Sequence, residues 1–139
     1  IDISSVDREQ LENFSACLGK NYKIGIKKSG SGNNCFRIQF SDVRLYKHLL
    51  KIGFTPHKSK TITKVDVPDK YFFDFLRGHF DGDGTIYAYK DSRWRNSYMF
   101  YFCLISASRD HIIWLQNQIY RLLNIKGSIS KAKTNLEKQ

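Results

Sequence analysis

Apolar residues recur at helical spacing in three segments of the chain. Residues 7–18 form the first segment, with Asp7 as a candidate N-cap and Gly19 as a stop signal. The second and third segments span residues 42–52 and 109–123. We therefore expect three amphipathic helices, each with one face toward a core.

Alternation of apolar and polar residues predicts two pairs of short strands. Residues 22–27 and 35–40 form the first pair, and residues 85–90 and 97–105 form the second. In the first pair, one side of each strand is apolar and the other side is basic and polar. Residues 125–133 look like the beginning of a further strand.

A more uniformly apolar segment lies between the two pairs of strands. Pro68 suits the first turn of a helix, and the residues that follow it up to about Phe80 are apolar on more than one side. Residues 81–84, Asp-Gly-Asp-Gly, end this expected buried helix. The elements before and after the helix echo each other weakly, at an offset of roughly a hundred residues, which suggests a repeated unit.

The charge of the chain points to a polyanionic partner. The chain has 139 residues, of which 41% are hydrophobic, and its formal net charge is +10. This is the size and composition of one globular domain. A basic excess spread over a folded domain favours nucleic acid as a partner, although a solvated basic surface without a specific role gives the same balance. No apolar run is long enough to span a bilayer, so we expect no membrane partner.

Cysteine usage indicates an intracellular protein. Cys17, Cys35 and Cys103 are widely spaced and form no C-x-x-C pair, so neither a disulfide framework nor a cysteine zinc site is expected. We interpret them as reduced core thiols of a protein of the cytoplasm or an organelle.

Two features of the central helix suggest chemistry. Gly78 and Gly82 lie on one helical face, where the absence of side chains lets a second helix approach closely. Asp81 and Asp83 lie at the C-terminal end, where the helix dipole disfavours carboxylates, so they suggest a bound cation such as Mg²⁺. With a second copy of the helix alongside, two acidic ends would form a two-metal site for phosphodiester hydrolysis.

The acidic segment could also be a calcium loop or a simple turn. An EF-hand loop that begins at Asp81 needs glycine and glutamate where the chain has Ile86 and Ser92, which excludes it. A plain Asp-Gly turn that ends a structural helix stays open. The apolar helix before the segment, and the strand and basic hairpin after it, favour a functional role.

From Ile3 through Lys131 the chain resembles the LAGLIDADG homing endonucleases. The nine-residue signature of that family corresponds to residues 76–84, Leu-Arg-Gly-His-Phe-Asp-Gly-Asp-Gly, and residues 85–86 continue into the first strand. Upstream, residues 53–61 and 67–75 are similar to the family's approach to its second motif helix.

The resemblance implies an α+β fold built from αββαββα units, with an antiparallel saddle sheet over the DNA major groove and a central motif helix. Residues 1–66 correspond to the latter part of one repeat, a helix, hairpin and helix, and residues 67–139 to the motif helix and the start of the next repeat. A complete active site then needs a second motif helix, from a homodimer mate or from a segment outside this chain.

The resemblance also implies a sequence-specific, Mg²⁺-dependent endonuclease of double-stranded DNA. Asp83 corresponds to the catalytic, metal-binding carboxylate, the carbonyl of Gly82 also reaches the metal, and Gly78 and Gly82 pack the motif helices together. Several family members carry a lysine where this chain has residues 106–108, Ser-Ala-Ser. The alternative is therefore a non-cleaving, maturase-type module that binds DNA or RNA, or an inactive fragment.

In such proteins the polar strand faces and the nearby loops contact the DNA. The contacts expected here are Lys23, Lys27, Arg37, Gln39, Lys58, Lys60, Thr85, Tyr87, Tyr89, Lys90, Arg93 and Arg95. Arginine and glutamine on strands suit base edges, whereas lysines in flexible loops suit phosphates. For any single basic residue, a solvated surface charge accounts for its presence equally well.

Overall fold

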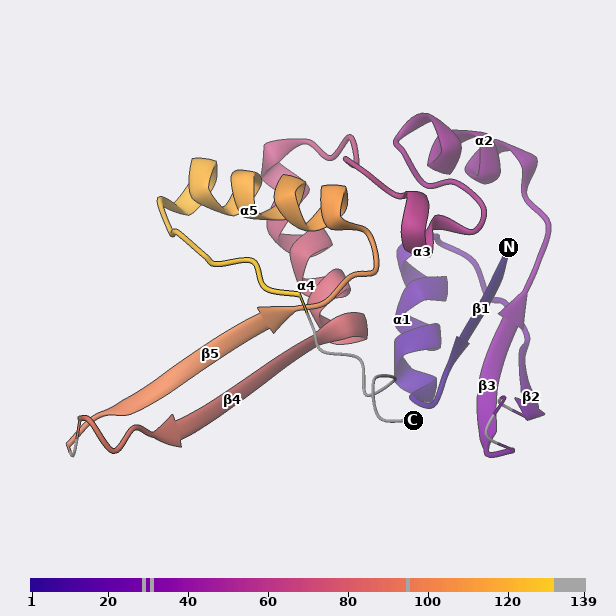
Figure 1. The fold of residues 1–139 in the computed structure, drawn as a ribbon. Coiled ribbons are helices and arrows are strands. Elements are labelled where there is room, and N and C mark those ends of the chain that lie inside the picture. The colour runs from indigo at the N-terminus through magenta and orange to yellow at the C-terminus, as the bar shows by residue number, and fades with distance from the viewer. Residues whose placement is uncertain (29, 31, 95, 132–139) are drawn as a thin grey trace, which may run out of the picture. The chain divides into compact units, whose positions relative to one another are not determined.

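The computed structural model describes residues 1–28, 30, 32–94 and 96–131, and it shows an α+β fold with small antiparallel sheets (Figure 1). The chain divides into two compact units, residues 1–48 and 49–139. In the described part of the chain, no helix is both long enough and apolar enough to cross a membrane.

The first unit is a three-stranded antiparallel sheet with a helix on one face. Its strands, in spatial order, are β1 (Asp2–Ser5), β3 (Asn34–Gln39) and β2 (Ile24–Lys28). Helix α1 (Arg8–Cys17) packs against β1 and β3. The side chains of Leu11 and Ile38 are fully buried, each 0% exposed, and form the centre of this core.

The ends of α1 follow the local sequence signals. The carboxylate of Asp7 accepts a hydrogen bond from the Glu9 amide at 2.9 Å, as an N-cap does. Gly19 has a φ of 61°, and its amide donates to the carbonyl of Ala16 at 2.9 Å, which ends the helix. The helix expected over residues 7–18 is therefore confirmed to within one residue at each end.

Two positions expected in the core of the first unit are exposed. Ile26 pairs with Phe36 on the side of the sheet that carries Ile38, yet it is 70% exposed. The reason is that β2 is an edge strand, whereas α1 packs over β1 and β3. Cys17, the last residue of α1, is exposed as well, whereas Cys35 is buried and Cys103 of the second unit is half-buried.

Helix α2 (Val43–Lys51) contains the boundary between the two units. The carboxylate of Asp42 accepts a hydrogen bond from the Leu45 amide at 2.9 Å and caps its beginning. After the helix, Gly53 has a φ of 108°, and a Cβ there would lie 2.6 Å from the carbonyl oxygen of Lys64. Only glycine fits this turn without strain.

The second unit joins helices to a two-stranded ribbon. Its elements are α3 (Lys58–Thr61), a 3-10 turn η1 (Asp69–Tyr71), α4 (Phe72–Asp83), β4 (Gly84–Lys90), β5 (Tyr98–Leu104) and α5 (Arg109–Leu123). Phe72 of α4 is 1% exposed and meets Trp114 of α5 edge to face, with ring centroids 6.1 Å apart. The ribbon of β4 and β5 extends away from α4 and α5 (Figure 1).

Two boundaries in the second unit differ from expectation. Helix α4 continues through Asp83 instead of ending near Phe80. Residues 125–131 form no strand, and positions 132 and 133 lie outside the described residues. A strand needs a neighbouring strand for its backbone groups, and this segment is instead attached to α5, where the Gln116 side chain donates to the Gly127 carbonyl at 2.6 Å.

Candidate functional site

The two carboxylates at the end of α4 have different surroundings. Asp81 is exposed and forms an ion pair with Arg77, one turn earlier, at 3.8 Å. Asp83 lines a pocket, and its backbone carbonyl accepts a hydrogen bond from the Ile105 amide at 3.3 Å. Because Ile105 follows β5 directly, this bond ties the end of α4 to the base of the ribbon. Asp83 is therefore positioned by two elements, whereas Asp81 is positioned by its own helix alone.

The two glycines of the central helix lie on an open surface. A Cβ added at Gly78 or Gly82 would meet no heavy atom within 4 Å among the described residues. The close helix contact expected at this face therefore has no partner in the described part of the chain. The carbonyl of Gly82 belongs to the last turn of α4, where carbonyls have no amide partner within the helix.

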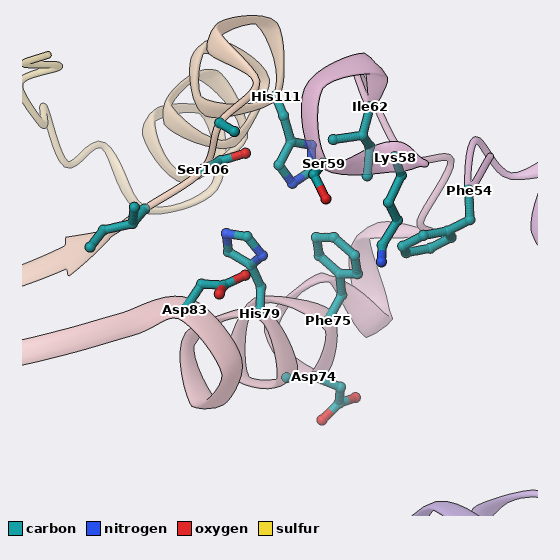
Figure 2. A pocket seen from close by; sticks show the side chains of 13 residues that line it. Phe54, Lys58, Ser59, Ile62, Asp74, Phe75, His79, Asp83, Ser106 and His111 are labelled. Carbon is teal, nitrogen blue, oxygen red and sulfur yellow. The ribbon is translucent and has the colours of Figure 1, made fainter. Parts of the chain in front are cut away.

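A pocket of about 600 Å³ lies on the side of α4 that carries His79 and Asp83 (Figure 2). Its lining comes from α4, from the segment around α3 and from the segment that leads into α5. The lining residues are Phe54, Lys58, Ser59, Ile62, Asp74, Phe75, Gly78, His79, Asp83, Ile105, Ser106, Ala107 and His111.

Two imidazole rings meet edge to face in this pocket. The rings of His79 and His111 are 5.3 Å apart between centroids and inclined by 75° (Figure 2). His111 is buried, and its Nδ1 lies 2.7 Å from the carbonyl oxygen of Thr63. A carbonyl only accepts, so Nδ1 of His111 carries a proton. Nε2 of His79 is buried and has no hydrogen-bond partner among the described residues.

Burial lowers the pKa of His79 below its ordinary value, and the neighbouring His111 lowers it further. Asp83 acts in the opposite direction, because a carboxylate favours a protonated imidazole, but its influence is the smaller one. His79 is therefore a neutral base at neutral pH. A neutral imidazole next to the carboxylate of Asp83 is a group that accepts protons or hydrogen bonds from a ligand in the pocket.

Sequence patterns alone assign no functional role to His79 and His111. The signal that points to His79 is its spacing: it lies four residues before Asp83 and therefore on the same side of α4. No comparable local signal marks His111. Its position depends on how α5 packs against the segment around Thr63.

One chain supplies few ligands for a metal ion. In the described ranges of the chain, no group of three or more histidine, cysteine, aspartate or glutamate residues is arranged to hold a metal. What the end of α4 offers is the exposed carboxylate of Asp83 and the carbonyl of Gly82. This oxygen-only pair suits Mg²⁺, which typically combines one or two carboxylates with water and phosphate oxygens.

The polar face of the first unit gathers three of the expected DNA contacts. The register of the sheet puts Lys27, Arg37 and Gln39 on the side opposite Ile38, and Lys23 is exposed just before β2. Arg37 is not a free cation, because its guanidinium pairs with both carboxylate oxygens of Asp2, at 3.0 and 2.5 Å. This pair lowers the pKa of the Asp2 carboxyl and raises the pKa of the arginine.

The expected contacts in the ribbon do not share one face. Thr85, Tyr87 and Tyr89 lie on one side, but Lys90 pairs with Tyr98 on the other, because successive residues of a strand alternate. Tyr101 is not among the expected contacts, yet it lies opposite Tyr87 on the same side as the other two tyrosines. Pairing the residues of the two strands outward from the turn would identify Tyr101 from the sequence.

The remaining basic positions lie outside the strands. Arg93 is held in the turn after β4 by the buried Asp91, with Nη2 and Oδ2 2.7 Å apart. Lys58 lines the pocket, and Lys60 is exposed on α3. Arg95, also an expected contact, lies outside the described residues.

Comparison of the chain with protein-family models, with curated proteins and with solved structures finds no match.

Proposed function

We propose that the chain is a LAGLIDADG-type endonuclease, or a large part of one, that hydrolyses both strands of double-stranded DNA at a specific sequence. The observation that carries this proposal is the construction of α4. Asp83 is its last residue, and Gly78 and Gly82 leave an open surface along the same helix. The net charge of +10 suits a polyanionic substrate.

The internal repeat supports the corresponding fold. In the first unit, β1 leads into α1, and in the second unit β5 leads into α5. In the first unit two further strands follow the helix, and in the second a hairpin precedes it. Superposing the two orders gives one αββαββα unit with a four-stranded antiparallel sheet. That sheet is the saddle on which the DNA would lie.

At the end of α4, the Asp83 carboxylate and the Gly82 carbonyl would hold Mg²⁺. The chemistry that Mg²⁺ would supply there is the activation of a water molecule and the stabilisation of charge on the phosphate. The contribution of the chain is to hold the backbone of Asp83 in place, through the hydrogen bond that the Ile105 amide donates to the Asp83 carbonyl. Asp81, engaged with Arg77 on the surface, has a structural role.

A second copy of α4 supplies the other half of the site. Packing of two helices through Gly78 and Gly82 brings two Asp83 carboxylates together near a twofold axis. Each carboxylate then serves one strand, which gives a staggered double-strand break. The second helix comes from a homodimer mate or from a segment outside this chain.

A non-cleaving module that binds DNA or RNA is the second candidate, and one observation favours it. Where several family members have a lysine, Ser106 and Ser108 are committed to the backbone. The Ser106 hydroxyl accepts from the Ser108 amide at 3.1 Å, and the Ser108 hydroxyl donates to the Ile62 carbonyl. Neither serine supplies the positive charge that would assist a leaving group.

The test is binding and cleavage measured on the same DNA. Duplexes that the chain retains from a randomised library are sequenced, resynthesised and incubated with Mg²⁺. We expect the wild type to cut them, Asp83→Asn to bind them without cutting, and the matched variant Asp81→Asn to cut them. Cleavage by Asp83→Asn would sink the assignment of the catalytic carboxylate. Tight binding by the wild type without Mg²⁺-dependent cleavage would establish the non-cleaving module instead.

A further inference from the structure

One face of the ribbon formed by β4 and β5 is dominated by tyrosine. The register of the two strands places on this face Thr85, Tyr87, Tyr89, Met99, Tyr101 and Cys103, which we call the tyrosine face. Phe80 of α4 stacks on Phe102, which belongs to the opposite face, with centroids 4.2 Å apart. The tyrosine face is therefore the side of the ribbon that points away from α4.

The tyrosine rings are exposed but engaged with one another. Tyr87 and Tyr89 are 47% and 41% exposed. Tyr101 stacks with both, at centroid distances of 5.1 and 5.6 Å and interplanar angles of 5° and 14°. The hydroxyls of Tyr89 and Tyr101 lie 3.3 Å apart. Because the flat faces of the rings point toward each other, the ladder presents ring edges and hydroxyls to its surroundings.

This geometry favours one of two kinds of nucleic-acid contact. Unpaired bases bind to aromatic side chains by stacking on an open ring face. Tyr101 has a parallel ring on each side, so both of its faces are occupied, and a base could stack only on the outer faces of Tyr87 and Tyr89. Binding to a duplex needs no open ring face, since the major groove admits a two-stranded ribbon and offers methyl groups and polar edges to side chains.

The composition of the tyrosine face decides what it recognises in a groove. Guanine is read by arginine or lysine, adenine by asparagine or glutamine, and cytosine by a carboxylate. None of these side chains belongs to the tyrosine face. What remains are the hydroxyls of threonine and tyrosine, which can bond to the edges of different bases and so discriminate little, and apolar contact with the C5-methyl group of thymine, for which ring edges and the Met99 side chain are suited.

We propose that the tyrosine face recognises thymine through its methyl group, so that the part of the DNA site under β4 and β5 is rich in thymine. This inference rests on the proposed function, because it assumes that duplex DNA is the partner. The basic charge of the chain supplies the attraction to the phosphates, and the ladder supplies the discrimination. On the polar face of the first unit, the side chain free to read DNA by hydrogen bonds would be Gln39, because Arg37 is paired with Asp2.

The experiment compares two duplexes that differ only in this methyl group. Binding of the full chain to alternating poly(dA-dT) and to alternating poly(dA-dU) is measured by competition against a fluorescent duplex. We expect binding to the uracil polymer to be weaker by at least about fourfold, the factor that corresponds to one buried methyl group. Methylation of cytosine at C5 in poly(dG-dC) places a methyl group at the same point of the groove and should strengthen binding.

Two variants of the same strand assign the effect to the tyrosine face. Tyr101→Ser should remove most of the discrimination between thymine and uracil, whereas Tyr98→Ser, on the opposite face, should keep it. Circular dichroism of both variants checks that the ribbon remains folded. Equal loss of discrimination in the two variants would overturn the assignment.

The outcomes separate this inference from the function on which it rests. Equal binding of the wild type to both polymers overturns thymine recognition and leaves DNA binding standing. Tighter binding to a single-stranded oligonucleotide of the same composition overturns it too, because the ladder would then be a stacking platform. Binding to no duplex at all, of either polymer or of mixed sequence, overturns both the inference and the proposed function.

Discussion

Gly84 lies against the ring of Phe80, so closely that a Cβ at position 84 would overlap the ring. The two residues are one helical turn apart, at the point where α4 ends and β4 begins. The same ring stacks on Phe102 of β5. The absence of a side chain at residue 84 therefore allows Phe80 to join the helix to the ribbon, and Asp83 is the last residue of the helix, directly before Gly84.

Gly84→Ala should destabilise the second unit by about 1–3 kcal/mol, because Phe80 would have to leave its place on Phe102. The measurement is urea unfolding followed by tryptophan fluorescence, since Trp94 and Trp114 both belong to this unit. Gly82→Ala is the control, because a Cβ there meets open space. Equal unfolding midpoints for the two variants would contradict the role assigned to Phe80.

Gly78→Ala should act in opposite directions on folding and on association. An alanine in an exposed helix position is up to about 1 kcal/mol more favourable than glycine, and nothing within 4 Å opposes its Cβ. The free energy of unfolding should therefore rise. Packing of a second helix at this surface should weaken, which light scattering with and without DNA would detect. If the variant is more stable and associates as the wild type does, the helix surface at Gly78 and Gly82 is not the interface.

The ends of the helices could be predicted from the sequence because short-range contacts determine them. Asp7 and Gly19 bound α1 through hydrogen bonds to residues two or three positions away. Asp42 and Gly53 do the same for α2. The end of α4 is less exact: the pattern predicts an end near Phe80, but the helix continues through Asp83, so the two acidic residues lie in its last turn.

The surroundings of the candidate residues could not be predicted, because they depend on residues far apart in the chain. The pair between Arg37 and Asp2 spans 35 residues and exists only because β1 lies next to β3. The contact between His79 and His111 depends on how α4 and α5 pack. Alternation along a strand indicates which side a residue takes, but it says nothing of the carboxylate that neutralises it.

Replacing Asp2 should strengthen DNA binding, because it frees the guanidinium of Arg37. In Asp2→Ala, Arg37 gains access to a phosphate, so the slope of the logarithm of affinity against the logarithm of salt should become steeper by about one. Glu12→Gln is the control, since it removes one negative charge from an exposed pair with Arg8 and leaves Arg37 paired. Fluorescence anisotropy over a salt series gives both slopes. Equal slopes for Asp2→Ala and Glu12→Gln would show that Arg37, even when freed from Asp2, makes no contact with a phosphate.

Ser108→Ala should destabilise the second unit by about 1–3 kcal/mol. The Ser108 hydroxyl accepts from the His111 amide at 3.3 Å, as an N-cap of α5, and donates to the carbonyl of Ile62. Removing the hydroxyl leaves the carbonyl of the buried Ile62 without this hydrogen-bond donor. Urea unfolding should show a lower midpoint than Ser92→Ala, a substitution of an exposed serine in the turn of the ribbon. Unchanged stability would mean that α5 is held in place without this cap.

The half-buried imidazole of His79 predicts a loss of stability in mild acid. Its pKa in the folded chain is lower than the ordinary value of 6.5, because burial and His111 both oppose its charge. The unfolded chain therefore binds a proton at a higher pH than the folded chain does. The contribution of a neutral His79 to the free energy of unfolding is therefore complete above pH 6.5, and it is lost as the pH drops through the folded-state pKa.

His79→Leu tests this prediction, because it keeps an apolar packing group and removes the titration. The groups around the ring are His111 from α5, Asp83 from α4 and Lys58 from α3, and they remain in the variant. We expect the difference in unfolding free energy between wild type and variant to shift in favour of the variant as the pH falls from about 7 toward about 5. Stability curves that stay parallel over this range would show that His79 titrates alike in the folded and the unfolded chain. The pocket would then be open enough to water to hydrate a charged imidazole, and it would not keep His79 neutral next to Asp83.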